Sequence, residues 1–256
     1  MIHATAVIDP SAQVDDSCDI GPYAVIGADV TVGARTKIGP HAVINGPTSI
    51  GSDNHIFQFA SIGEDPQDLK FDGLDSRLEI GNNNRIREFV TINRGTSGGG
   101  GVTRIGDDNL VMAYVHIAHD CLVGNNTIFA NSASLAGHVT VGDFAILGGF
   151  SLVHQFSRIG AHSFSGMGSV INKDVPPYLL VSGHYAEAKG INKQGLKRRG
   201  FDEKEIAALQ KTFIKIVRRR GVKDESAYAE VEKLAHEFPH VKSLMEFVRA
   251  EGRGTV

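Results

Sequence analysis

An aliphatic side chain returns at every sixth position along most of the chain from Ile2 to Ile171, and this period constrains the fold more than any other feature. A helix repeats apolar positions about every 3.6 residues and a strand about every 2, so a period of six fits neither as one long element. It predicts a chain that turns a corner at each repeat and stacks short parallel strands, coil upon coil. The first run is Ile2, Ile8, Val14, Ile20, Ile26, Val32, Ile38, Ile44, Ile50, Ile56 and Ile62.

The expected fold class is therefore mainly β: a left-handed parallel β-helix of hexapeptide repeats, with three hexads in each triangular coil. The repeat resumes at Ile80 and again, one residue out of phase, at Ile105, and it closes at Ile171. Val175-Pro176-Pro177 stops it, and the segment from there to Gly200 is expected to be irregular.

The period then becomes helical. Asp202 and Glu205 form the pattern of a capping box, which predicts a helix start. Three apolar stripes predict three helices: Ile206, Leu209, Phe213, Ile216 and Val217; Tyr228, Val231, Leu234 and Ala235; Val241, Leu244, Phe247 and Val248. We expect a β-helix domain over 1–189 and a C-terminal α-helical domain over 190–256 that covers the open end of the β-helix.

Composition is that of a globular protein without a membrane span. The chain has 256 residues, 41% apolar content and a net charge of −3. No apolar run approaches the roughly 20 residues of a spanning helix, and the N-terminus shows no signal-peptide pattern. Cys18 and Cys121 precede repeat aliphatics by two positions and are expected to be small, reduced and inward-facing. A cytoplasmic location is the expectation.

Two interruptions of the period mark loops. The first, residues 63–79, carries the sequence QDLK and places Asp68 where an aliphatic residue was due. The second, residues 93–104, carries a run of four glycines. Because loops on a rigid scaffold often carry function, we favour a functional role for the first; the second fits function and tolerated insertion equally.

Four histidines have spacings close to whole coils of three hexads. His119 and His138 are separated by slightly more than one such coil, and His116 and His154 by slightly more than two. They could be solvated corner residues, zinc ligands, or a catalytic cluster in which Asp120 holds His119 as a general base. The catalytic interpretation is favoured, because no Cys or carboxylate completes a familiar metal-ligand pattern.

Two basic runs occur late in the chain, at 197–199 and 218–220. Such runs are usually a solvated face, but they also suit capture of phosphates or of an acidic partner protein. Nucleic acid is disfavoured, because the isoelectric point is about 6.4 and no binding motif appears.

A series of motifs spread over essentially the whole chain resembles one family. In order these are IFQFASIGE, QDLK, NRIRE, RGT, DNL, HIAHDC, LAGHV, VHQF, DVPPY and GLKRRGF. The chain is similar to the UDP-N-acetylglucosamine acyltransferases of lipid A biosynthesis. This resemblance implies an acyltransferase that moves a 3-hydroxyacyl chain from acyl carrier protein to the 3-hydroxyl of UDP-N-acetylglucosamine. It also implies a homotrimer with active sites between subunits, and neither a metal nor a cofactor.

The resemblance also implies roles for individual residues. His119 matches the catalytic base and the backbone N–H of Gly137 an oxyanion donor, while the role of Asp120 rests on its position next to His119. The substrate contacts that it implies are Gln67, Asp68, Lys70, His116, His138, His154 and Gln155, together with Asn192, Arg198 and Arg199 around the nucleotide, its phosphates and the carrier.

Two positions depart from the family pattern. Asn93 stands where the family often has histidine, which bears on whether the acceptor sugar carries a 3-hydroxyl or a 3-amine. Met167 stands where some members have a glycine at the bottom of the acyl groove, and its side chain would fill part of that groove. We therefore expect a medium acyl chain, nearer to about ten carbons than to fourteen.

Two alternative functions remain. One is a related hexapeptide N-acyltransferase that uses a 3-amino sugar nucleotide; a close relative of that kind is expected to carry an additional N-terminal domain, whereas the repeat here begins at Ile2. The other is a zinc protein like the γ-type carbonic anhydrases, or a scaffold without activity.

Overall fold

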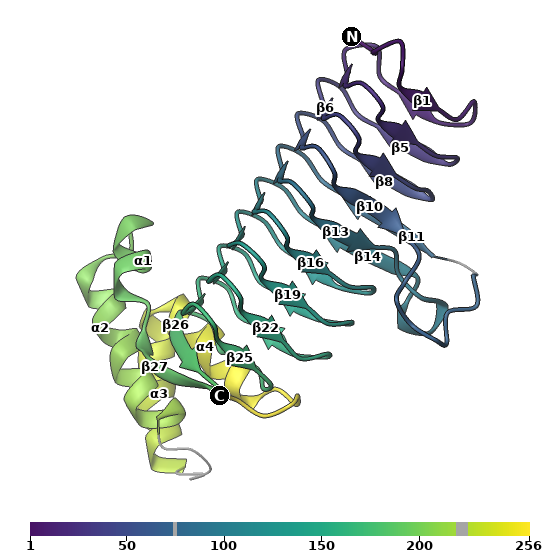
Figure 1. Cartoon of the computed structure of the whole chain (residues 1–256). Helices are drawn as coiled ribbons and strands as arrows, with labels where there is room; N and C mark the ends of the chain where they lie inside the picture. The colour runs from purple at the N-terminus through teal and green to yellow at the C-terminus, as the bar shows by residue number, and fades with distance from the viewer. Residues whose placement is uncertain (74–75, 219–224) are drawn as a thin grey trace.

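The computed structural model describes residues 1–73, 76–218 and 225–256, and it shows a left-handed parallel β-helix that ends in a small helical region (Figure 1). Three sheets form the faces of the prism. The first sheet is β1 (Val7–Ile8), β4 (Val25–Ile26), β7 (Val43–Ile44), β10 (Ser61–Glu64), β13 (Thr91–Asn93), β16 (His116–Ile117), β19 (Ser134–Leu135), β22 (Leu152–Val153) and β25 (Val170–Ile171).

The strands of the other two faces are also parallel, except for β27 at the end of the third sheet. The second sheet is β2 (Gln13–Val14), β5 (Val30–Val32), β8 (Thr48–Ile50), β11 (Arg77–Ile80), β14 (Val102–Ile105), β17 (Leu122–Val123), β20 (Thr140–Val141) and β23 (Arg158–Ile159). The third is β3 (Asp19–Ile20), β6 (Lys37–Ile38), β9 (His55–Ile56), β12 (Arg85–Ile86), β15 (Leu110–Val111), β18 (Ile128–Phe129), β21 (Ile146–Leu147), β24 (Phe164–Ser165), β26 (Leu179–Gly183) and β27 (Ala186–Ile191).

The aliphatic residues of the six-residue period form the core of the β-helix. From Ile20 onward the repeat aliphatics point inward and pair in register with those a coil away, as Ile26 does with Ile44 and Ile117 with Leu135. All four of these side chains are buried, and full burial of such a side chain stabilises the fold by about 1.5–3 kcal/mol. Cys18 and Cys121 are also buried and carry free thiols, as predicted.

Corners between hexads are made by residues in the left-handed conformation, such as Asp120 (φ 58°) and His138 (φ 62°). Stacked corners form three edges. At the edge between the first and second sheets, the segments that follow β10 and β13 leave the coil, and we name this the loop edge. We name the edge between the third and first sheets the aromatic edge, because rings stack there. The edge between the second and third sheets is named the tail edge, since it faces the C-terminal region.

The segment expected to be irregular is ordered instead, so that expectation was wrong. β26 pairs in parallel with β24 and therefore continues the third sheet, and β27 returns antiparallel to it. The hairpin was missed because it lacks the six-residue period. The helices follow: α1 (Lys193–Arg198), α2 (Glu203–Thr212), the π-helical η2 (Phe213–Val217), α3 (Glu225–Glu237) and α4 (Pro239–Arg249), with a short 3₁₀ turn, η1 (Ser97–Gly99), in the earlier glycine segment.

The helix start expected at Asp202 is present at α2. Asp202 accepts a hydrogen bond from Glu205 N, and the Glu205 side chain accepts one from Asp202 N. Residues 219 and 220 of the second basic run lie outside the described residues. The predicted domain boundary between 189 and 190 falls within β27, and the division into two domains stays a prediction.

The C-terminal tail is tied back to the β-helix by the buried Asp174. Its carboxylate accepts hydrogen bonds from the Arg158 guanidinium and from Arg253 N. Its backbone pairs with the tail, since Asp174 N donates to Gly254 O and Val256 N donates to Asp174 O. No helix among the described residues is both long and apolar enough to cross a membrane.

His162 at the tail edge makes stability depend on pH. Its ring stacks on Phe144 at 4.7 Å, and burial followed by the charges of Arg199 and His240 lowers its pKa from 6.5 to about 4. Between pH 6.5 and about 4, the His162 ring is protonated in the unfolded chain but stays largely neutral in the folded chain. Stability should therefore fall as the pH drops from 6.5 to about 4, by roughly 1–3 kcal/mol after allowance for partial exposure.

Urea unfolding of the parent and of His162→Phe across this range checks the prediction. The variant should lose less stability on acidification, because a phenyl ring does not titrate. The matched control is His41→Phe, a stacked ring on the aromatic edge, which should retain the parental slope. Equal slopes for parent and His162→Phe would refute the assignment.

Candidate active site

The loop edge gathers most of the predicted site residues because successive coils place equivalent corners above one another there. The pairing of Ile117 with Leu135 sets His119 level with Gly137, and Asp120 level with His138. The spacing of about one coil predicted that the two histidines lie near each other, and their rings meet edge to face at 5.1 Å. Gly137 therefore occupies the position one coil away from His119, and Asp120 occupies the position one coil away from His138.

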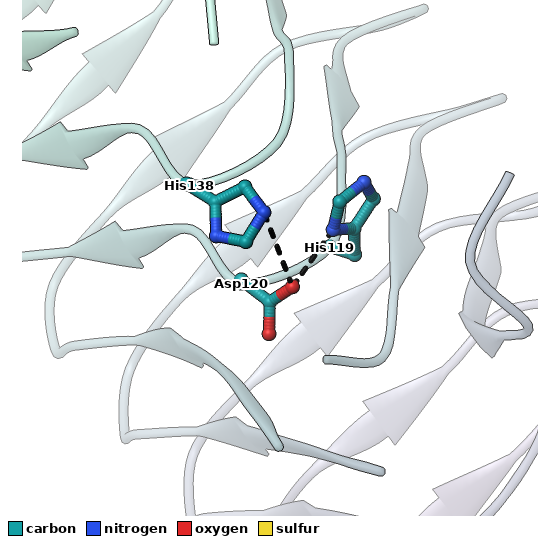
Figure 2. Close-up of side chains that lie close together, drawn as sticks. All are labelled: His119, Asp120 and His138. Carbon is teal, nitrogen blue, oxygen red and sulfur yellow. Dashed lines mark hydrogen bonds and ion pairs between the residues drawn. The ribbon is translucent and has the colours of Figure 1, made fainter. Parts of the chain in front are cut away.

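His119 and Asp120 form a hydrogen-bonded pair (Figure 2). His119 Nδ1 lies 2.8 Å from Asp120 Oδ2, and His138 Nε2 lies 3.8 Å from the same oxygen. The Asp120 side chain is 1% exposed, whereas that of His119 is 15% exposed. A buried carboxylate accepts the Nδ1 proton of its partner, so the Nε2 atom of His119 is left with a free lone pair. This tautomer suits a general base.

Asp120 is held by two threonines whose roles the sequence had not indicated. Its Oδ1 accepts from Thr96 N at 2.8 Å, and its Oδ2 accepts from Thr96 Oγ1 at 2.6 Å. Its own N–H donates to Thr103 Oγ1 at 2.8 Å. These threonines precede Asp120 by 24 and 17 residues, and neither spacing is a whole coil, so only the folded chain reveals the contacts.

Gly137 leaves room for the His119 ring. A Cβ atom on this glycine would lie 2.5 Å from His119 Cε1 and 2.7 Å from Nε2. Real Cβ atoms do not approach so closely, so any larger residue must push the imidazole aside. The absence of a side chain also leaves the backbone of Gly137 next to the ring nitrogen that would carry the proton.

Two further histidines near the base are held neutral. Burial, followed by the nearby His119, lowers the pKa of His116, and its Nδ1 lies 2.7 Å from Thr91 Oγ1. Burial also lowers the pKa of His138, against the opposing charges of Asp120 and Asp68. Near pH 7 both rings are therefore neutral hydrogen-bonding groups.

The QDLK sequence, in the loop between β10 and β11, projects from the loop edge beside the histidines. Gln67 and Lys70 are exposed, while the half-buried Asp68 is close enough for its charge to act on the pKa of His138. Asn93 ties the segment down, because its buried Nδ2 donates to Asp65 O at 2.8 Å. The Oδ1 of Asn93 is buried without a partner among the described residues.

The remaining predicted residues are only partly brought together. His154 and Gln155 are exposed on the loop edge one coil further on. Met167 lies on the aromatic edge and is 81% exposed. Asn192, Arg198 and Arg199 lie in the C-terminal region; Asn192 caps α1, and Arg199 donates to Phe144 O at the tail edge. Within one chain the structure does not bring these last four residues to His119.

One group of side chains in the described part of the chain has spacing compatible with a metal ion. Ligand atoms of His119, Asp120 and His138 lie within 4.8 Å of one another. The oxygens of this carboxylate, however, already accept hydrogen bonds from Thr96 N, from Thr96 Oγ1 and from His119 Nδ1. This arrangement favours a hydrogen-bonded dyad over a metal centre.

Comparison with known proteins matches both parts of this architecture. A family model described as bacterial transferase hexapeptide matches residues 103–137, and one described as UDP-N-acetylglucosamine O-acyltransferase, domain 2, matches residues 174–256. The acyl-[acyl-carrier-protein]–UDP-N-acetylglucosamine O-acyltransferase of Janthinobacterium sp. (strain Marseille) is 51% identical, with 100% of this chain and 99% of that protein covered. The chain belongs to the UDP-N-acetylglucosamine O-acyltransferase family. It is an acyltransferase.

Other members of the family agree along the full length. The enzyme of Alkalilimnicola ehrlichii that bears the same description is 54% identical, with 99% of this chain and 98% of that protein covered. The crystal structure of the UDP-N-acetylglucosamine O-acyltransferase of Moraxella catarrhalis superposes with a TM-score of 0.96 at 46% identity, covering 100% of this chain and 99% of the other. The fold and the helical tail are thus those of the family.

The contact between Gly137 and His119 yields a test. Gly137→Ala should lower kcat by about 100-fold or more, because the new methyl group displaces the imidazole by the ångström or so that positioning tolerates poorly. Tm should change little, since the clash is with the end of a side chain. Gly149→Ala is the control: its Cβ would meet only Asn131 O, at 3.4 Å. Full activity of Gly137→Ala would show that the ring position at this corner is unimportant.

Proposed function

We propose that this acyltransferase transfers a 3-hydroxyacyl chain from acyl carrier protein to the 3-hydroxyl of UDP-N-acetylglucosamine, the first step of lipid A biosynthesis. The names of its relatives, which include both acyl carrier protein and UDP-N-acetylglucosamine, support both substrates. The observation that carries the chemistry is the buried Asp120 on Nδ1 of His119, with Nε2 left free beside a glycine corner.

The proposed reaction is a direct transfer. His119 Nε2 takes the proton from the sugar 3-hydroxyl, and the oxygen attacks the carbonyl carbon of the thioester. The Gly137 N–H stabilises the oxyanion of the tetrahedral intermediate. As the C–S bond breaks, the imidazolium returns its proton to the carrier thiolate. Atoms and charge balance without a metal, a cofactor or a covalent acyl-enzyme.

Residues around the base would hold the substrates. The neutral rings of His116 and His138 suit hydrogen bonds to sugar hydroxyls without competing for the proton. Asp68 and Lys70, on the segment pinned by Asn93, lie at the same edge and suit the sugar and the start of the acyl chain. The exposed His154 and Gln155 continue the strip along which the chain would lie.

Four of the expected site residues lie away from the loop edge, one on the aromatic edge and three in the C-terminal region. We propose a homotrimer, as the family resemblance implies, in which a neighbouring subunit supplies Arg198, Arg199, Asn192 and Met167 to the site. The C-terminal domain, residues 190–256, would then bring its basic side chains to the nucleotide phosphates and the acidic carrier.

The role of His119 has a direct test. His119→Ala should lower kcat by at least about 1,000-fold, because general-base and orientation effects are both lost, and Asp120→Asn should lose about 100-fold or more. Size-exclusion mass should remain that of the parent. Substantial activity in His119→Ala, or a zinc ion bound stoichiometrically and required for turnover, would overturn this mechanism.

The exposed Met167 has a separate test of acyl length. The parent is expected to select chains of about ten carbons from a mixed pool of 3-hydroxyacyl carriers, because the methionine would fill the end of the proposed groove. Met167→Gly should shift the products toward longer chains, as measured by mass spectrometry. An unchanged length distribution removes Met167 from this role.

The same product masses distinguish the alternative acceptor. A 3-amino sugar nucleotide would yield an amide that differs from the ester in mass and resists mild alkali. Asn93 is the residue that motivates this alternative. Preference for the amine would replace the 3-hydroxyl in the proposal but leave His119 as the base.

A further inference from the structure

We propose that Thr96 is a positioning residue for the reaction: it clamps the Asp120 carboxylate from the glycine segment and thereby sets the orientation and basicity of His119. This role rests on the proposed function of His119 as the base. It gives a purpose to the second interruption of the repeat, residues 93–104, which the proposed mechanism does not otherwise use.

Thr96 contacts both oxygens of the carboxylate. Its N–H donates to Oδ1 at 2.8 Å and its hydroxyl donates to Oδ2 at 2.6 Å. Oδ2 is also the oxygen that faces His119 Nδ1, at 2.8 Å. Thr96 is 8% exposed and Asp120 is 5% exposed, so these bonds form away from bulk water, where hydrogen bonds to a charge are strong.

Hydrogen bonds from the glycine segment, residues 98–101, hold the backbone of Thr96 in position. Gly99 N and Gly101 N both donate to Thr96 O, at 3.0 and 2.8 Å. Gly99 lies so close to the carboxylate that a Cβ on it would overlap the Asp120 carboxyl carbon. Glycine is therefore needed at this position for the segment to close over the aspartate.

The clamp is also linked to the QDLK segment. Ser97 Oγ donates to the Asp72 carboxylate at 3.2 Å, and Arg77 N donates to Gly101 O at 2.9 Å. The loop that carries QDLK is thus linked to Asp120: Ser97 hydrogen-bonds to that loop, and the adjacent Thr96 hydrogen-bonds to the carboxylate. The two interruptions of the repeat meet at the base.

The chemical consequence follows from the shared oxygen. The hydroxyl of Thr96 withdraws charge from Oδ2 and fixes the plane of the carboxylate. Without it, Oδ2 becomes a stronger acceptor for His119 alone, which stabilises the protonated imidazole, and the carboxylate can rotate. A base that is protonated more readily at low pH and oriented less well should lower kcat and move the acid limb of the pH profile upward.

Thr96→Val tests this with the least disturbance, because valine keeps the backbone donor and the side-chain volume. We expect kcat to fall about 10–100-fold, KM for either substrate to change less than about twofold, and the acid limb of kcat/KM to shift by about half a pH unit or more to higher pH. Thr96→Ser, which retains the hydroxyl, should recover most of kcat and the parental profile.

The matched control is Thr127→Val. Thr127 is also buried and donates its hydroxyl to a side-chain oxygen, Asn109 Oδ1 at 2.6 Å, on the tail edge. It should lose comparable stability but keep kcat and the pH profile. If Thr96→Val does not fold, Thr96→Cys, a weaker donor of similar size, takes its place with the same expectations in smaller measure.

A double-mutant cycle with Asp120→Asn separates the two proposals. If Thr96 acts through Asp120, adding Thr96→Val to Asp120→Asn should change kcat less than about twofold. Activity surviving in His119→Ala would defeat the proposed base. If His119→Ala is inactive but Thr96→Val matches the parent in kcat and pH profile, or if its effect is undiminished in the Asp120→Asn background, the clamp alone is overturned.

Discussion

The in-register stacking of three-hexad coils is the constraint on which the rest of the structure depends. Every aliphatic residue of the period must lie above its neighbour for the core to close, as Ile117 lies beside Leu135. The same register fixes what happens at the corners, where polar residues have no packing of their own to align them. His119 meets Gly137, and Asp120 meets His138, because the buried aliphatics beside them pair.

The charge at the centre of the site depends on that geometry. Burial of the Asp120 carboxylate is costly without partners, since an unpaired charge in a low-dielectric setting is strongly destabilised. The carboxylate is partnered by Thr96 from the glycine loop, by the adjacent His119 and, more distantly, by His138 one coil away. Burial also lowers the pKa values of His116 and His138, so both rings are neutral near pH 7. Of the rings that face the carboxylate, only His119 lies at hydrogen-bond distance.

Much of the fold was predictable from the sequence. The period of six predicts inward positions such as Ile26 and Phe129, and these are buried. The capping box at Asp202 was visible because caps are local patterns. The hairpin β26–β27 was not, since the Val-Pro-Pro segment separates it from its pairing partner β24 and its own sequence carries no turn signal of the repeat.

The site was predictable only where spacing follows the coil. His119 and His138 are about one coil apart, so their approach could be expected. Thr96 lies within the interruption at residues 93–104, where the six-residue count is broken, so no spacing rule places it on Asp120. Residues that depend on another subunit, as proposed for Arg198 and Met167, could not be located from the period at all, because the period describes one chain.

A crystal structure with UDP-N-acetylglucosamine bound tests the central claim most directly. We predict the sugar 3-hydroxyl oxygen within about 3 Å of His119 Nε2, with Asp120 on Nδ1 and the Gly137 N–H directed at the space where the thioester carbonyl would sit. A 3-hydroxyl placed away from Nε2, or a metal ion seated between His119 and His138, would contradict it.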